Sequence, residues 1–300
     1  MTQKTLRSKL SLAKTSDIEI AYETFGDHGA HPLVLIMGLG YQMIFWDGKL
    51  CAQLAKKGYY VIRFDNRDVG LSTWLESAGV PDILAMKQLM AKRKTAQASY
   101  SLHDMAGDVT GLLDALKIKS AHIVGRSMGG MIGQMMAIHY PERVKTLTSI
   151  MSSTSDPSLP PPKQEVLSVL LEPEPIDIQG FVEHTLRSWE ILNGTVLPLD
   201  EAQVRKWAHE SYQRGLNPDG AARHFAAILA TGNRKEALKS IKVPTLVIHG
   251  DADPLVPVEC GIDTAEAISG ARLVIIKGMG HTLAREVYPQ IIEAISHHAV

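Results

Sequence analysis

The stretch that decides the fold is AHIVGRSMGGMIGQMM, residues 121–136. Its first residues form an apolar run that predicts a buried strand, and the residues after Ser127 predict a helix. The serine therefore lies between a strand and a helix, within the G-x-S-x-G pattern of a nucleophile elbow. So tight a turn strains the backbone, and Gly125 and Gly129 remove side chains that would collide with it. The alternative is a glycine-rich turn without chemistry.

Apolar runs of the same kind recur on both sides of this turn. They predict buried strands at 33–37, 59–64, 144–151, 244–249 and 271–276, and helical patterns lie between them at 46–57, 102–116 and 283–298. Such alternation is typical of a mostly parallel sheet with helices on both faces, an α/β fold. Alternating residues near 18–22 predict an antiparallel hairpin at one sheet edge. Residues 65–101 give no clear pattern.

The composition changes after residue 152. Four prolines occupy 157 and 160–162, and from 163 to about 231 only helical patterns occur, without a strand run. This insertion is about half the length of a typical domain of roughly 150 residues. We therefore predict a helical cap at 153–232 on a core domain formed by residues 1–152 and 233–300.

A serine hydroxyl needs a neighbouring base to become a nucleophile near neutral pH. Of the 12 histidines, His281 is the candidate, because it follows the last strand and the flexible Gly278-Met279-Gly280. That position lies at the carboxyl edge of the sheet, where open α/β folds bind ligands. The histidines at 28, 31, 122, 139, 297 and 298 fit surface or structural positions better.

A carboxylate must hold the imidazole in the correct tautomer. We predict Asp253, which lies far out on the loop after the strand that ends at His249 and precedes Pro254. Asp251, next to Gly250, fits a turn better. Asp156, after the preceding strand, remains an alternative.

Two backbone N–H groups are expected to stabilise the negative charge of the reaction. Met128 follows the serine, and Leu39 lies between two glycines after an early strand, although these glycines also fit a plain turn. Apolar residues crowd the same region. We predict that Met43, Phe45 and Trp46 line a substrate pocket, with core packing as the alternative for such residues.

Charge and composition limit the partners. Lys plus Arg number 31 and Asp plus Glu number 32, which gives a net charge of -1 and does not favour nucleic acid or an anionic membrane. No zinc-binding spacing or phosphate-binding glycine motif occurs, so we expect no metal or cofactor. No apolar run reaches the roughly 18 residues of a membrane span, and the N-terminus lacks a signal-peptide pattern. We therefore expect a cytoplasmic protein; the basic residues at 87–94 fit a solvated helix face.

Several motifs together resemble the α/β-hydrolase family from about residue 18 to 299. They are MGLG at 37–40, FDNRDVGLS at 64–72, GRSMGG at 125–130, YPERV at 140–144, HGDADP at 249–254 and GMGH at 278–281. The resemblance implies an eight-stranded sheet, a helical cap, a triad of Ser127, Asp253 and His281, and oxyanion donors at Leu39 and Met128.

Two positions depart from the family pattern. Met37 stands where His is frequent, and Asp68 stands where many members have Gly. The Arg-Asp form resembles most the branch that contains aclacinomycin methylesterase, which implies ester cleavage. We therefore expect a serine hydrolase of small to medium apolar esters. A hydrolase of another bond (C–C beside a ketone, lactone or amide) and a non-catalytic ligand-binding protein are the alternatives.

Overall fold

The computed structural model describes residues 8, 10–15, 17–91, 96–170, 172 and 174–299. Its centre is an eight-stranded sheet with the strand order β1-β2-β4-β3-β5-β6-β7-β8. The strands are β1 (Ser11–Lys14), β2 (Glu19–Phe25), β3 (His31–Ile36), β4 (Tyr59–Phe64), β5 (Ala121–Arg126), β6 (Val144–Ile150), β7 (Thr245–Gly250) and β8 (Arg272–Ile276). At one edge, β1 pairs antiparallel with β2, and β2 pairs antiparallel with β4. The remaining pairs, along β4-β3-β5-β6-β7-β8, are parallel. The predicted α/β fold, with its edge hairpin, is confirmed.

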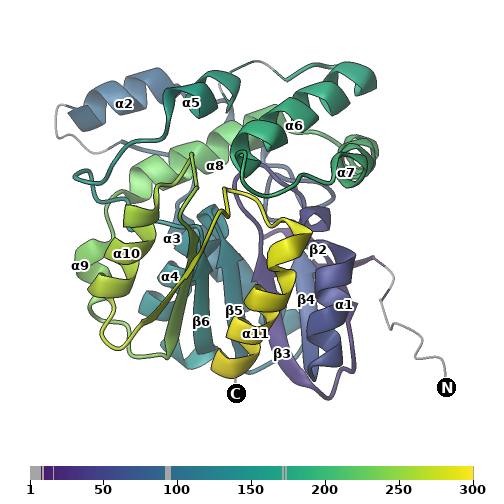
Figure 1. Ribbon diagram of the computed structural model, residues 1–300, viewed down its shortest axis with the longest axis vertical. Coiled ribbons are helices and arrows are strands. Elements are labelled where there is room, and N and C mark those ends of the chain that lie inside the picture. Colours follow the sequence, from purple (N-terminus) through teal and green to yellow (C-terminus); the bar gives the residue numbers. More distant parts are fainter. Residues whose placement is uncertain are drawn as a thin grey trace.

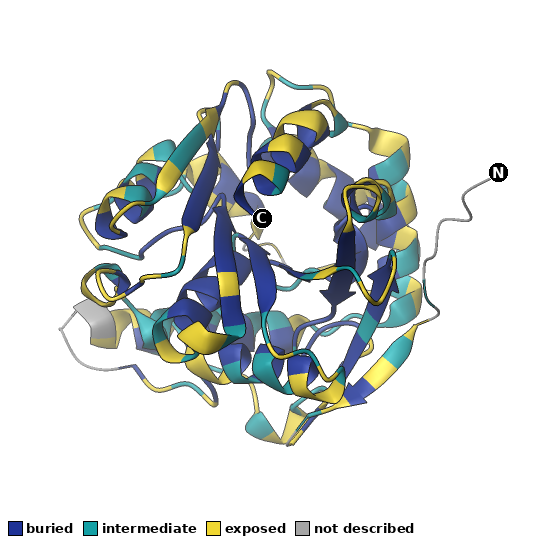
Figure 2. Cartoon of the chain, turned by 90° about the horizontal axis from the view of Figure 1, so that it is seen from below, coloured by how far each residue is buried: buried dark blue, intermediate teal, exposed yellow. Residues whose placement is uncertain are grey.

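Helices cover both faces of the sheet (Figure 1). α1 (Gly48–Lys56) and α11 (Tyr288–His298) lie on one face, whereas α3 (Leu102–Ala115) and α4 (Met128–His139) lie on the other. In β3, Leu33 and Leu35 pack with the first pair of helices, and Val34 and Ile36 pack with the second. Both faces of the strand are apolar because both are covered, and Figure 2 shows the central strands in the dark blue of buried residues.

A layer of helices lies across one end of the sheet (Figure 1). It contains α5 (Gln164–Leu170), α6 (Ile178–Asn193), α7 (Glu201–Arg214) and α8 (Pro218–Thr231), all between β6 and β7. None of the described residues between these two strands is in a strand. We call residues 153–232 the helical insert. It is followed by the short α9 (Lys235–Leu238), and α10 (Val258–Ala267) lies between β7 and β8.

One helix of this layer comes from the segment that the sequence left unassigned. α2 (Ile83–Ala91) packs against α8, where Met86 contacts Ala226 in a small apolar cluster. Lys87 of the basic run is exposed, with its ammonium 5.2 Å from the ring centroid of Phe225. The other basic residues of that run, at 92–94, lie outside the described residues.

Two helix boundaries differ from the prediction. The helix expected from residue 46 begins at Gly48, because Asp47 caps it by accepting a hydrogen bond from the N–H of Lys49 at 2.9 Å. Residues Met43–Phe45 form a separate 3-10 turn. The last helix begins at Tyr288 rather than 283, after a 3-10 turn at Arg285–Val287. α3 starts as predicted at residue 102, where Ser101 and Asp104 form a capping box.

None of the helices within the described ranges has both the length and the apolarity needed to cross a bilayer.

Candidate active site

Ser127 lies at the point where β5 ends and α4 begins. Its φ of 54° and ψ of −124° lie outside the regions that L-residues normally occupy. Two hydrogen bonds hold this strained backbone: the Ser127 N–H donates to the Ile150 carbonyl at 2.9 Å, and its carbonyl accepts from the Ser152 hydroxyl at 2.8 Å. The neighbouring strand β6 therefore fixes the turn that presents the Ser127 hydroxyl.

The glycines of the elbow leave no room for a side chain. A Cβ at Gly125 would lie 2.0 Å from the carbonyl oxygen of Gly129, and a Cβ at Gly129 would lie 2.2 Å from that of Ile36. A Cβ at Gly130 would lie 2.6 Å from the Cβ of Ser152. These contacts give the physical reason for the motif, because the turn and its helix lie directly against two strands.

The structure brings His281 and Asp253 to this serine. The Nε2 atom of His281 lies 3.1 Å from the Ser127 Oγ, and its Nδ1 lies 2.7 Å from Oδ2 of Asp253. The other carboxylate oxygen accepts hydrogen bonds from the N–H groups of Leu255 and Val256 at 2.9 and 2.8 Å. His281 and Asp253 are both buried. The carboxylate is thus fixed by its own loop and directs one oxygen at the imidazole.

The two other acids considered from the sequence have different partners. Asp251 accepts a hydrogen bond from the Gly278 N–H at 2.6 Å and so holds the loop that leads to His281. Asp156 accepts from Ser158 and lies 3.6 Å from the Lys235 ammonium.

The helical insert holds the His281 loop from the other side. The His281 N–H donates to the carbonyl of Leu192 in α6 at 2.7 Å, and the Thr282 hydroxyl donates to the Asn193 side chain at 2.5 Å. A Cβ at Gly280 would lie 2.4 Å from the Asn193 carbonyl oxygen, so this approach requires glycine. The end of α6 therefore fixes the position of the imidazole.

The early glycine loop lies beside the serine. A Cβ at Gly38 would lie 3.2 Å from the Cβ of Ser127. Within the part of the chain that the structure describes, the N–H groups of Leu39 and Met128 have no hydrogen-bond acceptor. Both predicted donors therefore belong to segments that adjoin Ser127 and keep their N–H groups unused.

A histidine of the insert holds this glycine loop. His224 of α8 accepts a hydrogen bond from the Gly40 N–H at its Nδ1, at 3.2 Å, and donates from Nε2 to the carbonyl of Arg67 at 2.8 Å. Burial lowers the pKa of His224 to about 4. The imidazole is therefore neutral near pH 7, with its proton on Nε2, since a carbonyl only accepts.

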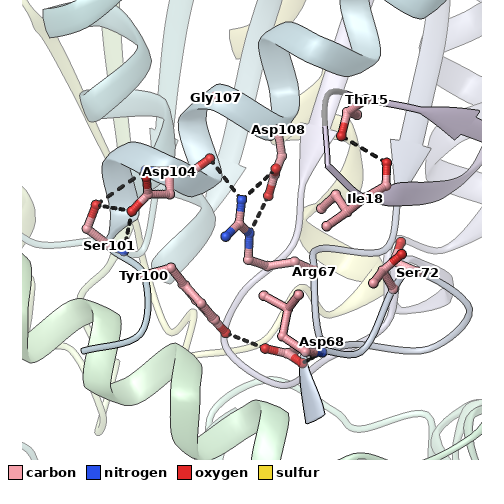
Figure 3. Close-up of polar contacts among 12 residues, drawn as sticks. Thr15, Ile18, Arg67, Asp68, Ser72, Tyr100, Ser101, Asp104, Gly107 and Asp108 are labelled. Carbon is pink, nitrogen blue, oxygen red and sulfur yellow. Dashed lines mark hydrogen bonds and ion pairs between the residues drawn. The ribbon is translucent and has the colours of Figure 1, made fainter. Parts of the chain in front are cut away.

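The segment after β4 carries two charged side chains with partners in other parts of the chain. Figure 3 shows Arg67 beside Asp108 and Asp68 beside Tyr100. The Arg67 guanidinium donates to both oxygens of Asp108 at 2.6 and 2.7 Å. Asp68, which has a φ of 64°, accepts two hydrogen bonds from Arg223 of α8, both at 2.8 Å, and one from the Tyr100 hydroxyl. Burial alone would raise the pKa of Asp68, but the hydrogen bonds from Arg223 and other donors hold that pKa below its ordinary value.

This geometry accounts for the departure noted at Asp68. Glycine would satisfy the positive φ, and aspartate also tolerates that conformation. Its carboxylate adds a buried, bidentate ion pair with Arg223 that a glycine lacks. α8 is therefore bound to the core rather than lying loosely over it.

α7 is anchored in a similar way. Its last residue, Arg214, forms an ion pair with the buried Asp65 and donates to the Gln42 side chain at 2.8 Å. Asp65 also accepts from the Met43 N–H at 2.7 Å. Burial raises the pKa of Asp65 and outweighs the opposing effect of Arg214. This network fixes the start of the Met43–Phe45 turn beside the glycine loop.

The predicted pocket residues are almost fully buried. Met43 and Trp46 expose no surface, and Phe45 stacks on Trp189 of α6 with ring centroids 5.5 Å apart. A cavity of about 260 Å³ borders on Trp189. Its walls include Trp189, Val204, Trp207, Thr282, Leu283 and Tyr288. The three predicted residues are not on its surface, and Phe45 adjoins it only through Trp189 and Trp207.

The sequence did not reveal the contacts of Asp65, Arg214 and His224, or the burial of Arg126. For Arg126 a signal was available: a charged residue in a strand whose two faces are otherwise apolar needs an explanation. The partners of the other three come from distant segments, and no local pattern indicates them.

Comparisons with known proteins agree with this architecture. Residues 31–284 match a family model described as the alpha/beta hydrolase fold. The chain is 28% identical to rhodomycin D methylesterase DnrP of Streptomyces peucetius, over 94% of this chain and 95% of that protein. It is 26% identical to 3-oxoadipate enol-lactonase 2 of Acinetobacter baylyi, over 87% of this chain and 86% of the other.

A solved structure extends the likeness to the whole fold. The crystal structure of a hydrolase from Pseudomonas aeruginosa aligns with a TM-score of 0.71 and 26% identity, over 97% of this chain and 98% of the other. The family model covers most of the chain, and two of the curated relatives are rhodomycin D methylesterases, the kind of enzyme that the Arg-Asp motif indicated. The protein therefore belongs to the α/β-hydrolase fold family.

Proposed function

We propose that this protein is a serine hydrolase that cleaves carboxylic esters with Ser127 as nucleophile, His281 as base and Asp253 as the orienting acid. The observation that carries the proposal is the continuous chain of contacts from the Ser127 hydroxyl through the imidazole to a fixed carboxylate. Hydrolase activity is also the function of the relatives named above.

The reaction proceeds in two halves. His281 accepts the proton of Ser127 as the Oγ attacks the ester carbonyl, and the N–H groups of Leu39 and Met128 stabilise the resulting oxyanion. His281 then gives the proton to the leaving alcohol, and an acyl group remains on the serine. Water, activated by the same imidazole, cleaves the acyl-enzyme. No metal or organic cofactor takes part.

The expected substrates are small to medium esters with apolar parts. The cavity beside the His281 loop has a volume of about 260 Å³, just below the range of roughly 300–1,000 Å³ that is typical of small-molecule sites. Aromatic and aliphatic side chains form much of its wall, which also includes Asp200, Gln203, Arg285 and Glu286. We further propose that the helical insert, residues 153–232, acts as a cap on a core formed by 1–152 and 233–300. Its contacts at Leu192, Arg223 and His224 support this role, because each reaches a loop of the catalytic site.

Lactone hydrolysis is a second candidate, supported by the 26% identity to an enol-lactonase. The same three residues open a lactone by the same acyl transfer, so the site alone does not separate the two. A panel of open-chain esters and lactones, compared by kcat/KM, distinguishes them.

A fluorophosphonate is expected to label Ser127 stoichiometrically and to abolish ester hydrolysis, because an activated serine attacks phosphorus as it attacks a carbonyl. Intact-mass and peptide mass spectrometry measure the adduct and its position. Heat-unfolded protein is the control and is expected to stay unlabelled. Absence of an adduct on the folded protein would favour the non-catalytic ligand-binding alternative.

Two variants of His224 are expected to distinguish the catalytic effects of its two hydrogen bonds. Asparagine retains an acceptor near the position of Nδ1 and keeps the bond to the Gly40 N–H, whereas glutamine reaches the position of Nε2 and retains only the bond to the Arg67 carbonyl. If Gly40 must be held to position the Leu39 N–H, His224→Gln lowers kcat by about 10- to 100-fold with little change in KM, and His224→Asn lowers it less.

Steady-state kinetics and thermal unfolding of both variants measure this difference. Equal losses of kcat in the two variants, in proportion to their losses of stability, would assign His224 a purely structural role.

A further inference from the structure

Arg126, which occupies the first x position of the G-x-S-x-G motif, points into an apolar layer. Side chains alternate along β5, and Val124 packs in the core cluster beneath α1 and α11. Arg126 therefore faces the same layer, and only 4% of its surface is exposed. Burial lowers the pKa of Arg126 to about 10, so the guanidinium still carries its charge near pH 7.

No carboxylate among the described residues forms an ion pair with this charge, although Asp253 acts on it at longer range and opposes the fall in its pKa. Other buried arginines form such pairs: Arg63 with Glu23, and Arg223 with Asp68. The Arg126 side chain makes one hydrogen bond, from Nη1 to the Phe45 carbonyl at 3.5 Å, and its Nε has no acceptor. A buried and unsatisfied charged group is costly to the folded state, so it calls for a partner.

Arg234 shows how a buried arginine is satisfied without a carboxylate. It is 3% exposed, and burial lowers its pKa to about 10 as well. Its N–H groups donate to the Gln134 side chain and to the carbonyls of Gly232 and Ser153 at 2.7–3.0 Å. Burial of a guanidinium therefore does not by itself explain the unused donors of Arg126.

Two more unused donors lie next to Arg126. Its guanidinium carbon lies over the rings of Trp46 and Trp189, 6.0 and 5.9 Å from their centroids, so both indoles give the charge a cation–π contact but accept no hydrogen bond from it. Among the described residues, no acceptor meets the buried Nε1 atoms of these tryptophans at hydrogen-bond geometry. The Tyr41 hydroxyl does lie close to Trp189, whose indole opposes the rise in the pKa of Tyr41 that burial causes. Indole and guanidinium groups only donate hydrogen bonds. Three donor-only groups around one positive charge match the needs of an anion with acceptor oxygens.

We propose that Arg126, Trp46 and Trp189 form a binding site for a carboxylate group of the substrate. Arg126 directly precedes the catalytic serine in the chain, and its charge lies close enough to Asp253 for that carboxylate to act on it. Trp189 also lines the cavity that reaches Thr282, the neighbour of His281. The expected substrate is thus an ester or lactone whose acyl part carries a second, ionised carboxyl group a few carbons from the reacting carbonyl. This assignment rests on the proposed ester hydrolysis.

Kinetics test the proposal with two matched substrates. One is the p-nitrophenyl monoester of adipate, and the other is a neutral p-nitrophenyl ester whose acyl chain ends in an isopropyl group in place of the carboxylate. The rate with Ser127→Ala protein is subtracted from each. We expect the wild-type protein to prefer the anionic ester in kcat/KM, and Arg126→Met to lower that preference by about tenfold or more.

Arg234→Met is the matched control, since it removes a buried guanidinium of similar pKa far from the unused donors. It is expected to leave the ratio of the two kcat/KM values unchanged. A ratio that is the same in wild-type and Arg126→Met protein, with both esters hydrolysed, would overturn the carboxylate site and leave the hydrolase proposal intact.

A binding measurement is independent of turnover and of the folding of any Arg126 variant. The chain has 4 tryptophans, so the ¹⁵N-labelled indole signals of Ser127→Ala protein are readily resolved. Monomethyl adipate is expected to shift the Trp46 and Trp189 signals saturably, whereas neutral dimethyl adipate is not. Trp74 is the internal control, because its Nε1 donates to the Gly70 carbonyl at 3.0 Å.

Absence of these indole shifts at high millimolar carboxylate would also overturn the proposal. Saturable shifts together with a complete lack of ester hydrolysis by the wild-type protein would instead contradict the proposed function and support the carboxylate site.

Discussion

Replacing Ser127 by alanine is expected to lower kcat for p-nitrophenyl esters by about 10⁶-fold, the scale seen when a triad nucleophile is removed. The loss is this large because the variant has no group that forms an acyl-enzyme. The N–H groups of Leu39 and Met128 remain, so a small rate above that of water is expected to persist. Steady-state assays at high enzyme concentration, with the substrate still in excess, measure it.

The fold is expected to survive this substitution. The hydroxyl of Ser127 makes one contact at 3.1 Å with His281, whereas the bonds that hold its backbone to Ile150 and Ser152 do not involve it. Ser149→Ala is the matched control, because it removes a buried hydroxyl of β6 for which the described part of the chain offers no hydrogen-bond partner. Circular dichroism and thermal unfolding check both variants. Wild-type turnover by Ser127→Ala protein would refute the assignment of the nucleophile.

The central sheet was predictable because of its burial. Strands that are covered on both faces are continuous apolar runs, as at 33–36 and 121–124, and these runs stand out against the helical patterns around them. Helix starts were less accurate, since the sequence does not reveal that the turn at Met43–Phe45 interrupts the pattern before α1. Propensity and periodicity do not resolve such short turns.

The segment 65–101 was not predictable for a different reason. Its conformation depends on partners that are distant in sequence: Asp68 bonds Arg223, 155 residues away, and α2 packs on α8. Local patterns contain no information on such contacts. The motif FDNRDVGLS indicated the family, but its physical role became clear only when α8 was found against it.

The candidate site was largely predictable because parallel strands end at one edge of a sheet. Ser127, Asp253 and His281 each follow the carboxyl end of a strand, so their order in the chain and the strand order bring them together. A charge in an apolar strand draws attention to Arg126, but its lack of an ion-pair partner among the described residues was not predictable, because that requires knowledge of every neighbour of a buried side chain. The same holds for the contact of His224 with the glycine loop.

Asp253→Asn is expected to lower kcat by about 10⁴-fold while leaving the loop intact. The carbonyl oxygen of the new amide still accepts from the N–H groups of Leu255 and Val256, so the amide NH₂ faces the imidazole. The imidazole Nδ1 must then accept a hydrogen bond, which moves the proton of the neutral ring to Nε2. In that tautomer His281 has no lone pair for the Ser127 proton.

Asp251→Asn is the matched control for this choice of acid. Asp251 accepts a hydrogen bond from the Gly278 N–H at 2.6 Å, and asparagine retains an oxygen that accepts the same bond. This bond does not involve the imidazole of His281. Its kcat is expected to stay within about threefold of the wild-type value, the range of a substitution that preserves a neutral hydrogen bond. Single-turnover rates of acyl-enzyme formation compare the two variants. A large loss for Asp251→Asn with near-normal rates for Asp253→Asn would assign the orienting role to Asp251. The reason is that Nε2 acts as a base only while a carboxylate holds the imidazole proton on Nδ1.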